Sequence, residues 1–160
     1  MTKKNVLFYG LVVLVFFSGE FLVSRGMVTG TPPALAAKTI TGESVVNRIA
    51  SGQGLIYFWA HWCGVCRMMQ EPVSQVLKDY PGVTVALKSG TEDSVKRYLN
   101  DQGLDWPVVN DARGTIGDRY GVRGVPAVFV LNPEGNIVFT SSGYSTELGL
   151  RIRLWLAGFF

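Results

Sequence analysis

Cys63 and Cys66 are the only cysteines of this 160-residue chain, and two residues separate them. Residues three positions apart in a helical turn lie near the Cα separation that a disulfide requires. A ring this small constrains the unfolded chain little, so a purely structural disulfide is not expected. The spacing favours reversible exchange between a dithiol and a disulfide.

The residues around the pair predict how it is positioned. Leu55 to Ala60 form a continuous apolar and aromatic run, which is typical of a buried central strand. Cys63 follows this strand, and a helical pattern of apolar residues begins at Gly64. The free N–H groups and the dipole at a helix start stabilise a thiolate, and Arg67 adds positive charge in the first turn.

This setting assigns different roles to the two thiols. We expect Cys63, at the end of the strand, to be exposed and to attack a partner's disulfide as the nucleophile. Cys66 lies one turn further into the helix and is expected to resolve the mixed disulfide. Trp62 precedes the attacking cysteine and is expected to flank the bound partner.

Metal binding is the alternative use of two thiols. Zinc normally takes four ligands, and the chain has no second cysteine pair and a single histidine, His61. Two thiolates also suit Cu(I), with Met68 or His61 as further ligands. A Cu(I)-binding module is therefore the competing hypothesis, and titration of the reduced protein with Cu(I) would test it.

The rest of the chain alternates strand and helix patterns. Apolar spacing from Gly64 to Tyr80 predicts one helix, kinked at Pro72. Further strands are expected at 83–87, 106–109, 127–131 and 137–141, and helices at 44–50, 91–102 and 147–156, with a short helix within 111–120. This order predicts an α/β fold whose mixed sheet is covered by helices on both sides.

The last helix has an apolar face and a charged one. Its larger apolar residues fall on one face, which comprises Leu148, Ile152, Trp155, Leu156 and Phe159. Arg151 and Arg153 are expected on its solvated side.

The N-terminus has the pattern of a membrane anchor. Residues 6–23 are predominantly apolar, and as a helix they rise about 27 Å, close to the hydrocarbon thickness of a bilayer. Lys3 and Lys4 precede them and favour an N-inside orientation, with the remaining chain outside the cytoplasm. We therefore expect an anchor at 1–23, a linker at 24–33 and one folded domain at 34–160. A cleaved signal peptide is the alternative, because Ala34-Leu35-Ala36 fits the cleavage pattern.

The charge composition limits the classes of molecule that the chain is expected to bind. The formal net charge is +3, and the lysines and arginines are scattered along the chain. Nucleic acid is therefore not an expected partner. The sequence predicts neither a cofactor nor a metal for the leading hypothesis.

Several segments resemble the thioredoxin superfamily. Trp59 to Arg67 is similar to its active-site segment, and Val125-Pro126 is similar to its cis-proline loop. The linker and Gly121 to Pro126 resemble the membrane-anchored, extracytoplasmic branch that includes the cytochrome c-maturation thioredoxins. Gly143 to Trp155 is similar to the suppressor-for-copper-sensitivity protein D group.

The resemblance carries specific expectations. It implies a three-layer α/β/α thioredoxin-like fold with Pro126 in the cis form beside the disulfide. Val125 would then offer its backbone to an extended partner chain. The branch implies a reductase of protein disulfides, fed by a membrane thiol-electron transporter. It further implies a single-pass protein of the bacterial inner membrane, with its catalytic domain in the periplasm and a link to copper tolerance.

Two positions depart from the family pattern. Tyr57 stands six residues before Cys63, where thioredoxins carry a buried acid. Met69 stands six residues after Cys63, where the anchored reductases often carry a glutamate, and Glu71 lies two positions further on. The sequence therefore names no proton carrier.

Overall fold

The computed structural model describes residues 26–35, 38–49 and 52–160. The predicted anchor at 1–23 lies outside these residues. Within the described ranges, no helix is both long and apolar enough to cross a membrane.

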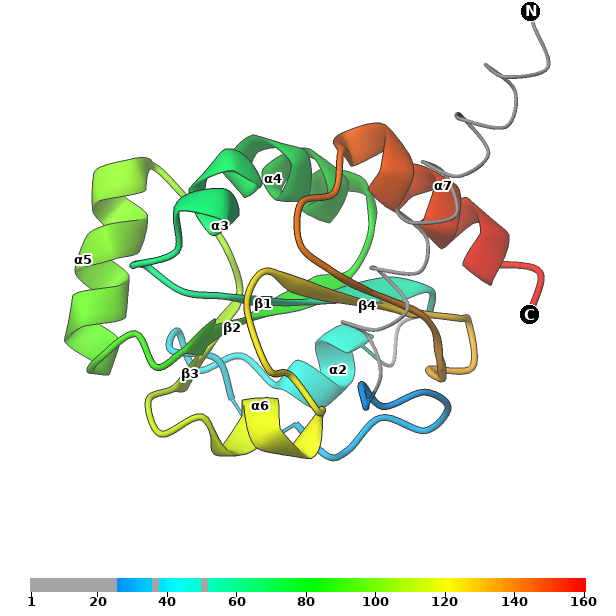
Figure 1. Cartoon of the computed structure of the whole chain (residues 1–160), viewed down its shortest axis with the longest axis horizontal. Coiled ribbons are helices and arrows are strands. Elements are labelled where there is room, and N and C mark those ends of the chain that lie inside the picture. Colours follow the sequence, from blue (N-terminus) through cyan, green and yellow to red (C-terminus); the bar gives the residue numbers. More distant parts are fainter. Residues whose placement is uncertain (1–25, 36–37, 50–51) are drawn as a thin grey trace, which may run out of the picture.

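Five strands form one mixed sheet in the order β3-β2-β1-β4-β5 (Figure 1). The strands are β1 (Gly54–Trp59), β2 (Gly82–Leu87), β3 (Val108–Asp111), β4 (Ala127–Leu131) and β5 (Ile137–Ser142). β1 pairs in parallel with β2 and antiparallel with β4, and β2 pairs in parallel with β3. The predicted mixed sheet is confirmed, with β1 at its centre. All six residues of β1 are buried, as its apolar run predicted.

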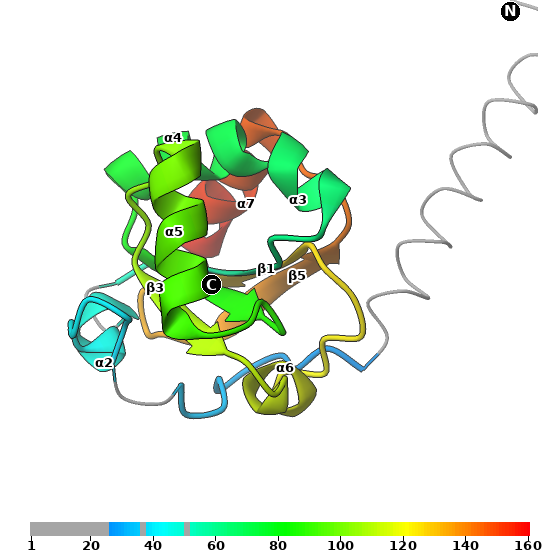
Figure 2. The same cartoon turned by 90° about the vertical axis from the view of Figure 1, so that its left-hand side faces the viewer.

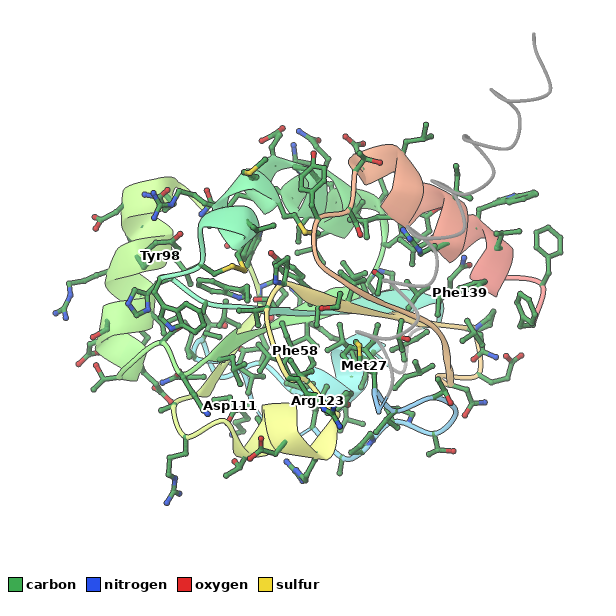
Figure 3. All side chains as sticks on the ribbon, viewed as in Figure 1. Met27, Phe58, Tyr98, Asp111, Arg123 and Phe139 are labelled. Carbon is green, nitrogen blue, oxygen red and sulfur yellow. A yellow bond between two sulfur atoms is a disulfide. The ribbon has the colours of Figure 1, made fainter. Side chains whose placement is uncertain are left out.

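Helices cover both faces of this sheet (Figures 1 and 2). Above it in Figure 1 lie α3 (Gly64–Met68), α4 (Gln70–Asp79) and α7 (Glu147–Ala157), with α5 (Glu92–Gln102) at one end; below it lie α2 (Val45–Ile49) and α6 (Thr115–Arg119). Successive side chains of β1 point to opposite faces of the sheet, so alternate residues pack against the two helical layers. Tyr57 and Trp59 pack in the core with the cysteines, whereas Phe58 packs with Tyr120. Figure 3 shows Phe58 on the α6 side of the sheet.

The helix predicted from Gly64 to Tyr80 is instead two helices. The break falls at Met69, and Pro72 occupies the first turn of α4 rather than a kink within one helix. Proline has no N–H to donate to the carbonyl four residues earlier, and its ring clashes with that carbonyl. A first-turn N–H has no intrahelical acceptor anyway, so the chain restarts its helix just before the proline.

The burial of α7 differs from the predicted amphipathic pattern. Its buried residues are Leu150, Leu154 and Ala157, which pack in the core beneath α4 and α7. Arg151 and Arg153 are partly buried at the flanks of the helix. The apolar face predicted from the sequence is the exposed one, because a helix with apolar residues on two sides leaves the hydrophobic pattern ambiguous.

The segment predicted as a linker at 24–33 makes specific contacts where it is described. Val28 N donates to Tyr120 O at 3.2 Å, and Gly30 forms a bridge with Ile137 at the start of β5. Tyr120 Oη donates to Pro33 O at 2.8 Å. Residues 26–35 therefore lie along the α6 side of the domain.

Candidate active site

Cys63 and Cys66 form a disulfide at the start of α3, directly after the loop that leaves β1. Their Cα atoms are 5.2 Å apart, within the range that disulfides require. Cys63 has extended backbone angles and is the N-cap residue of α3; its Sγ accepts the N–H of Cys66 at 3.1 Å. The same donor would stabilise a thiolate on Cys63 once the disulfide is reduced.

The two sulfurs differ slightly in access. Cys63 is 7% exposed and Cys66 is 3% exposed, so the nucleophile expected to be exposed is largely buried. The carbonyl oxygen of Val125 lies 3.5 Å from Cys63 Sγ and contributes to this burial.

The loop at 124–126 meets the disulfide from a distant part of the chain. The Val125–Pro126 peptide bond is cis, and Val125 O lies 3.5 Å from Cys63 Sγ. Pro126 is followed at once by β4, which pairs with β1 in the register Phe58↔Ala127. The antiparallel pairing of these two strands therefore brings the loop beside the first cysteine.

Trp62 forms an exposed wall of the site. Its side chain is 57% exposed, and its indole Nε1 donates to Lys88 O at 3.1 Å. Lys88 has a positive φ of 47°, which turns its backbone at the end of β2. The ring is thereby fixed at one edge while most of its surface stays open to a partner.

A second set of contacts holds the 60–62 loop in place. His61 N donates to Ser89 Oγ at 3.2 Å, and Ser89 is almost fully buried. The Trp59 ring stacks on Tyr98 of α5 at 5.5 Å between ring centroids. Ser89 and Tyr98 were not singled out from the sequence, because only the fold brings β2 and α5 to this loop.

Tyr57, Met69 and Glu71, the residues at or near the positions where relatives carry an acid, have different environments in the structure. Tyr57 is fully buried, and its hydroxyl has no hydrogen-bond partner among the described residues. Burial, with a smaller contribution from Tyr98, raises the pKa of this hydroxyl well above its ordinary range. Met69 is fully buried between the two helices, and the exposed Glu71 accepts a hydrogen bond from Gln75. Tyr57 therefore stays neutral at physiological pH.

No metal-ligand cluster accompanies the pair. Across the described ranges, no three or more histidine, cysteine, aspartate or glutamate residues are gathered in one place. Met68, named as a further copper ligand, is 65% exposed on the outer side of α3.

Comparisons with known proteins show which family and which relatives the chain resembles. The sequence pattern of the AhpC/TSA family matches residues 29–140. A "Thioredoxin-like protein" of Haemophilus influenzae is 35% identical over 98% of this chain and 95% of its own length. A "Thiol-disulfide oxidoreductase ResA" of Halalkalibacterium halodurans is 27% identical over 82% of this chain and 78% of its own. The crystal structure of StoA from Bacillus subtilis superposes with a TM-score of 0.65 at 26% identity, covering 76% of this chain and 96% of that one.

Proposed function

Because the chain belongs to the AhpC/TSA family, we propose that it is a thiol–disulfide oxidoreductase that acts on protein thiols and disulfides through Cys63 and Cys66. The observation that carries the proposal is the Cys63–Cys66 disulfide at the N-terminus of α3, beside Val125 O. Relatives named thiol-disulfide oxidoreductase support the same activity.

The proposed reaction proceeds by two exchange steps. The Cys63 thiolate attacks one sulfur of a partner's disulfide, which forms a mixed disulfide and releases the partner's other sulfur as a thiolate. The Cys66 thiolate then attacks Cys63 Sγ, and the partner sulfur that was bonded to Cys63 leaves as a thiolate. Two electrons have passed to the partner, and the chain returns to the Cys63–Cys66 disulfide seen in the structure.

The surroundings of Cys63 support a role in binding the partner. Trp62 provides an exposed aromatic surface next to the nucleophile. The carbonyl of Val125, which precedes the cis-proline Pro126, faces Cys63, and an extended partner chain can pair with such an edge. We assign substrate binding to Trp62, Val125 and Pro126.

The proposal also covers the direction of electron transfer and the cellular location of the protein. We propose that the protein reduces its partners and is itself re-reduced by a membrane thiol-electron transporter. The apolar segment at 6–23 and the preceding lysines support a single-pass anchor in the bacterial inner membrane, with the domain in the periplasm. The similarity of Gly143 to Trp155 to the suppressor-for-copper-sensitivity protein D group supports a role in copper tolerance.

Trapping of mixed disulfides tests the exchange reaction. Cys66→Ser in the full chain removes the resolving thiol, so Cys63-linked partners should accumulate and run as larger species on non-reducing gels. Cys63→Ser is the matched control, and it should trap little because it lacks the thiol that is proposed to attack the partner. Equal trapping by both variants, or none by Cys66→Ser, would contradict the assigned roles.

Two measurements test direction and location. Alkylation trapping in intact cells should find the pair mostly reduced, and a mostly oxidised pair would contradict the reductase direction. Mass spectrometry of the mature protein should find the N-terminal segment retained. A chain that begins at Ala37 would contradict the anchor.

A further inference from the structure

Helix α7 carries apolar residues on two opposite sides. Leu150, Leu154 and Ala157 are buried against the domain, whereas Leu148, Ile152, Trp155 and Phe159 are 68%, 48%, 61% and 71% exposed. At about 100° per residue, Leu148, Ile152 and Trp155 fall on the side opposite the buried face. Phe159 follows the end of α7 at Ala157, and its ring contact with Trp155 extends these exposed residues to four. We call them the α7 stripe; α7 lies on the outer side of its layer, so nothing in the described domain covers the stripe (Figure 1).

The spacing of the α7 stripe is that of a helix-pairing seam. Its members are separated by four, three and four residues, as are successive d and a positions of a coiled coil. The rings of Trp155 and Phe159 already meet edge to face, with centroids 4.9 Å apart. The stripe is therefore a continuous apolar ridge along the helix.

Charged groups of α7 are engaged within the same chain. Arg151 pairs with Glu147 and with Asp79, each at 2.7 Å, and Arg153 donates to Gly149 O at 3.2 Å. None of the four stripe positions is charged. The centres of protein interfaces are likewise depleted of charge, so the stripe can be covered without stranding an unpaired ion.

We propose that the α7 stripe is the contact by which two copies of this chain pair, with their α7 helices antiparallel about a two-fold axis. The four-three-four spacing reads the same in both directions, so Leu148 meets Phe159 of the second copy and Ile152 meets its Trp155. Each contact joins a smaller aliphatic side chain to a larger aromatic one, which lets the two ridges interdigitate. Antiparallel helices also oppose their dipoles favourably.

The exposed area suffices for a small dimer interface. Aromatic side chains bury about 150–250 Å² each, so the stripe with its neighbours Leu156 and Phe160 offers on the order of 600 Å² per copy. Two copies would bury about 1,200 Å², the lower limit of stable interfaces. An apolar patch of this size is at the upper end of what single-copy proteins expose.

The position of the N-terminal segment argues against a bilayer as the occupant. Residues 6–23 end three positions before Gly26, so the chain between them can reach over no more than about 10 Å. A Cβ on Gly26 would lie 3.5 Å from the Arg123 guanidinium, and Met27 and Arg123 lie on the α6 side of the sheet (Figure 3). A bilayer spanned by 6–23 would thus meet the α6 side, whereas the stripe points away from the sheet on the other side.

Native mass spectrometry of the full chain in detergent tests the proposal. The wild-type chain should appear at twice 17.5 kDa, and Ile152→Glu should appear at 17.5 kDa, because it places a charge in the centre of the stripe. Val46→Glu is the matched control: Val46 is 57% exposed on α2, so this variant should remain a dimer. Circular dichroism should show that both variants are folded.

A cross-link tests the register without disturbing the fold. Phe159→benzoylphenylalanine should, on irradiation, join mainly to Leu148 or its neighbours in the second copy. Cross-links to lipid, or to residues 6–23 of the same chain, would overturn the proposal in favour of those occupants. A monomeric wild-type chain, or a dimer that survives Ile152→Glu, would also overturn it. These measurements do not depend on the redox reaction, so the pairing proposal can fail without affecting the proposed function, and the reverse.

Discussion

The Sγ atom of Cys63 lies 3.5 Å from the carbonyl oxygen of Val125, a residue sixty-two positions further along the chain. The contact joins the start of α3 to the loop that enters β4. In the reduced protein, the Cys63 thiol can donate to this carbonyl. Under the proposed function, exchange chemistry and partner binding would meet at this contact.

Trp62 is expected to affect protein partners more than small ones. Trp62→Ala removes an exposed surface and one hydrogen bond to Lys88 O, so the free energy of unfolding of the variant should differ from wild type by less than about 1 kcal/mol. Its kcat/KM for a protein disulfide should fall about tenfold, equivalent to about 1.4 kcal/mol of binding. Its kcat/KM for a small aromatic disulfide should stay near wild type.

Trp62→Phe is the control for the aromatic surface, because it keeps a ring and removes only the N–H. It should retain most of the activity towards the protein disulfide. An equal loss for both substrates in Trp62→Ala would instead place its effect on the thiol itself.

Two buried tyrosines should respond differently to loss of the hydroxyl. Tyr57→Phe removes a hydroxyl without a partner in the described structure, so stability should be unchanged or rise by up to about 1 kcal/mol. Tyr120→Phe is the matched control, because it removes a 2.8 Å bond to Pro33 O and should lower stability by about 1 kcal/mol. Urea denaturation measures both, and a clear loss in Tyr57→Phe would show that its hydroxyl does have a partner.

The same tyrosines predict loss of stability at alkaline pH. Burial raises the folded-state pKa of Tyr57 and of Tyr120 above the ordinary value of 10.0. Above about pH 10 the unfolded chain loses these protons while the folded chain keeps them, so the free energy of unfolding falls as pH rises. Below pH 10 neither tyrosine contributes a slope. Tyr57→Phe should flatten the decline between pH 10 and 12, and an unchanged slope would contradict burial as the cause.

Gly121 tests whether residues 26–28 are fixed to the domain. Its φ is 69°, and a Cβ added there would overlap the carbonyl oxygen of Gly26. Gly121→Ala should therefore lower stability by about 2 kcal/mol and release this segment to limited proteolysis. Gly124→Ala is the control, because a Cβ there meets nothing within 4 Å. Equal effects of the two changes would show that the Gly26 contact is not maintained.

The sequence by itself determined the chemistry and the frame around it. A buried run at Leu55 to Trp59, followed by Cys63 and Cys66 at a helix start, predicted the central strand and the disulfide that the structure contains. The hairpin after β4 was also predictable, since Asn132 to Gly135 carries local turn chemistry. These features depend on residues close together in the chain, so local patterns are enough to find them.

Tertiary structure decided which surfaces face one another. Only the pairing of β1 with β4 places Val125 beside Cys63, and only packing shows that Leu150 rather than Ile152 is buried in α7. An apolar residue is compatible with either the core or an interface, and the choice depends on distant segments that no local pattern contains.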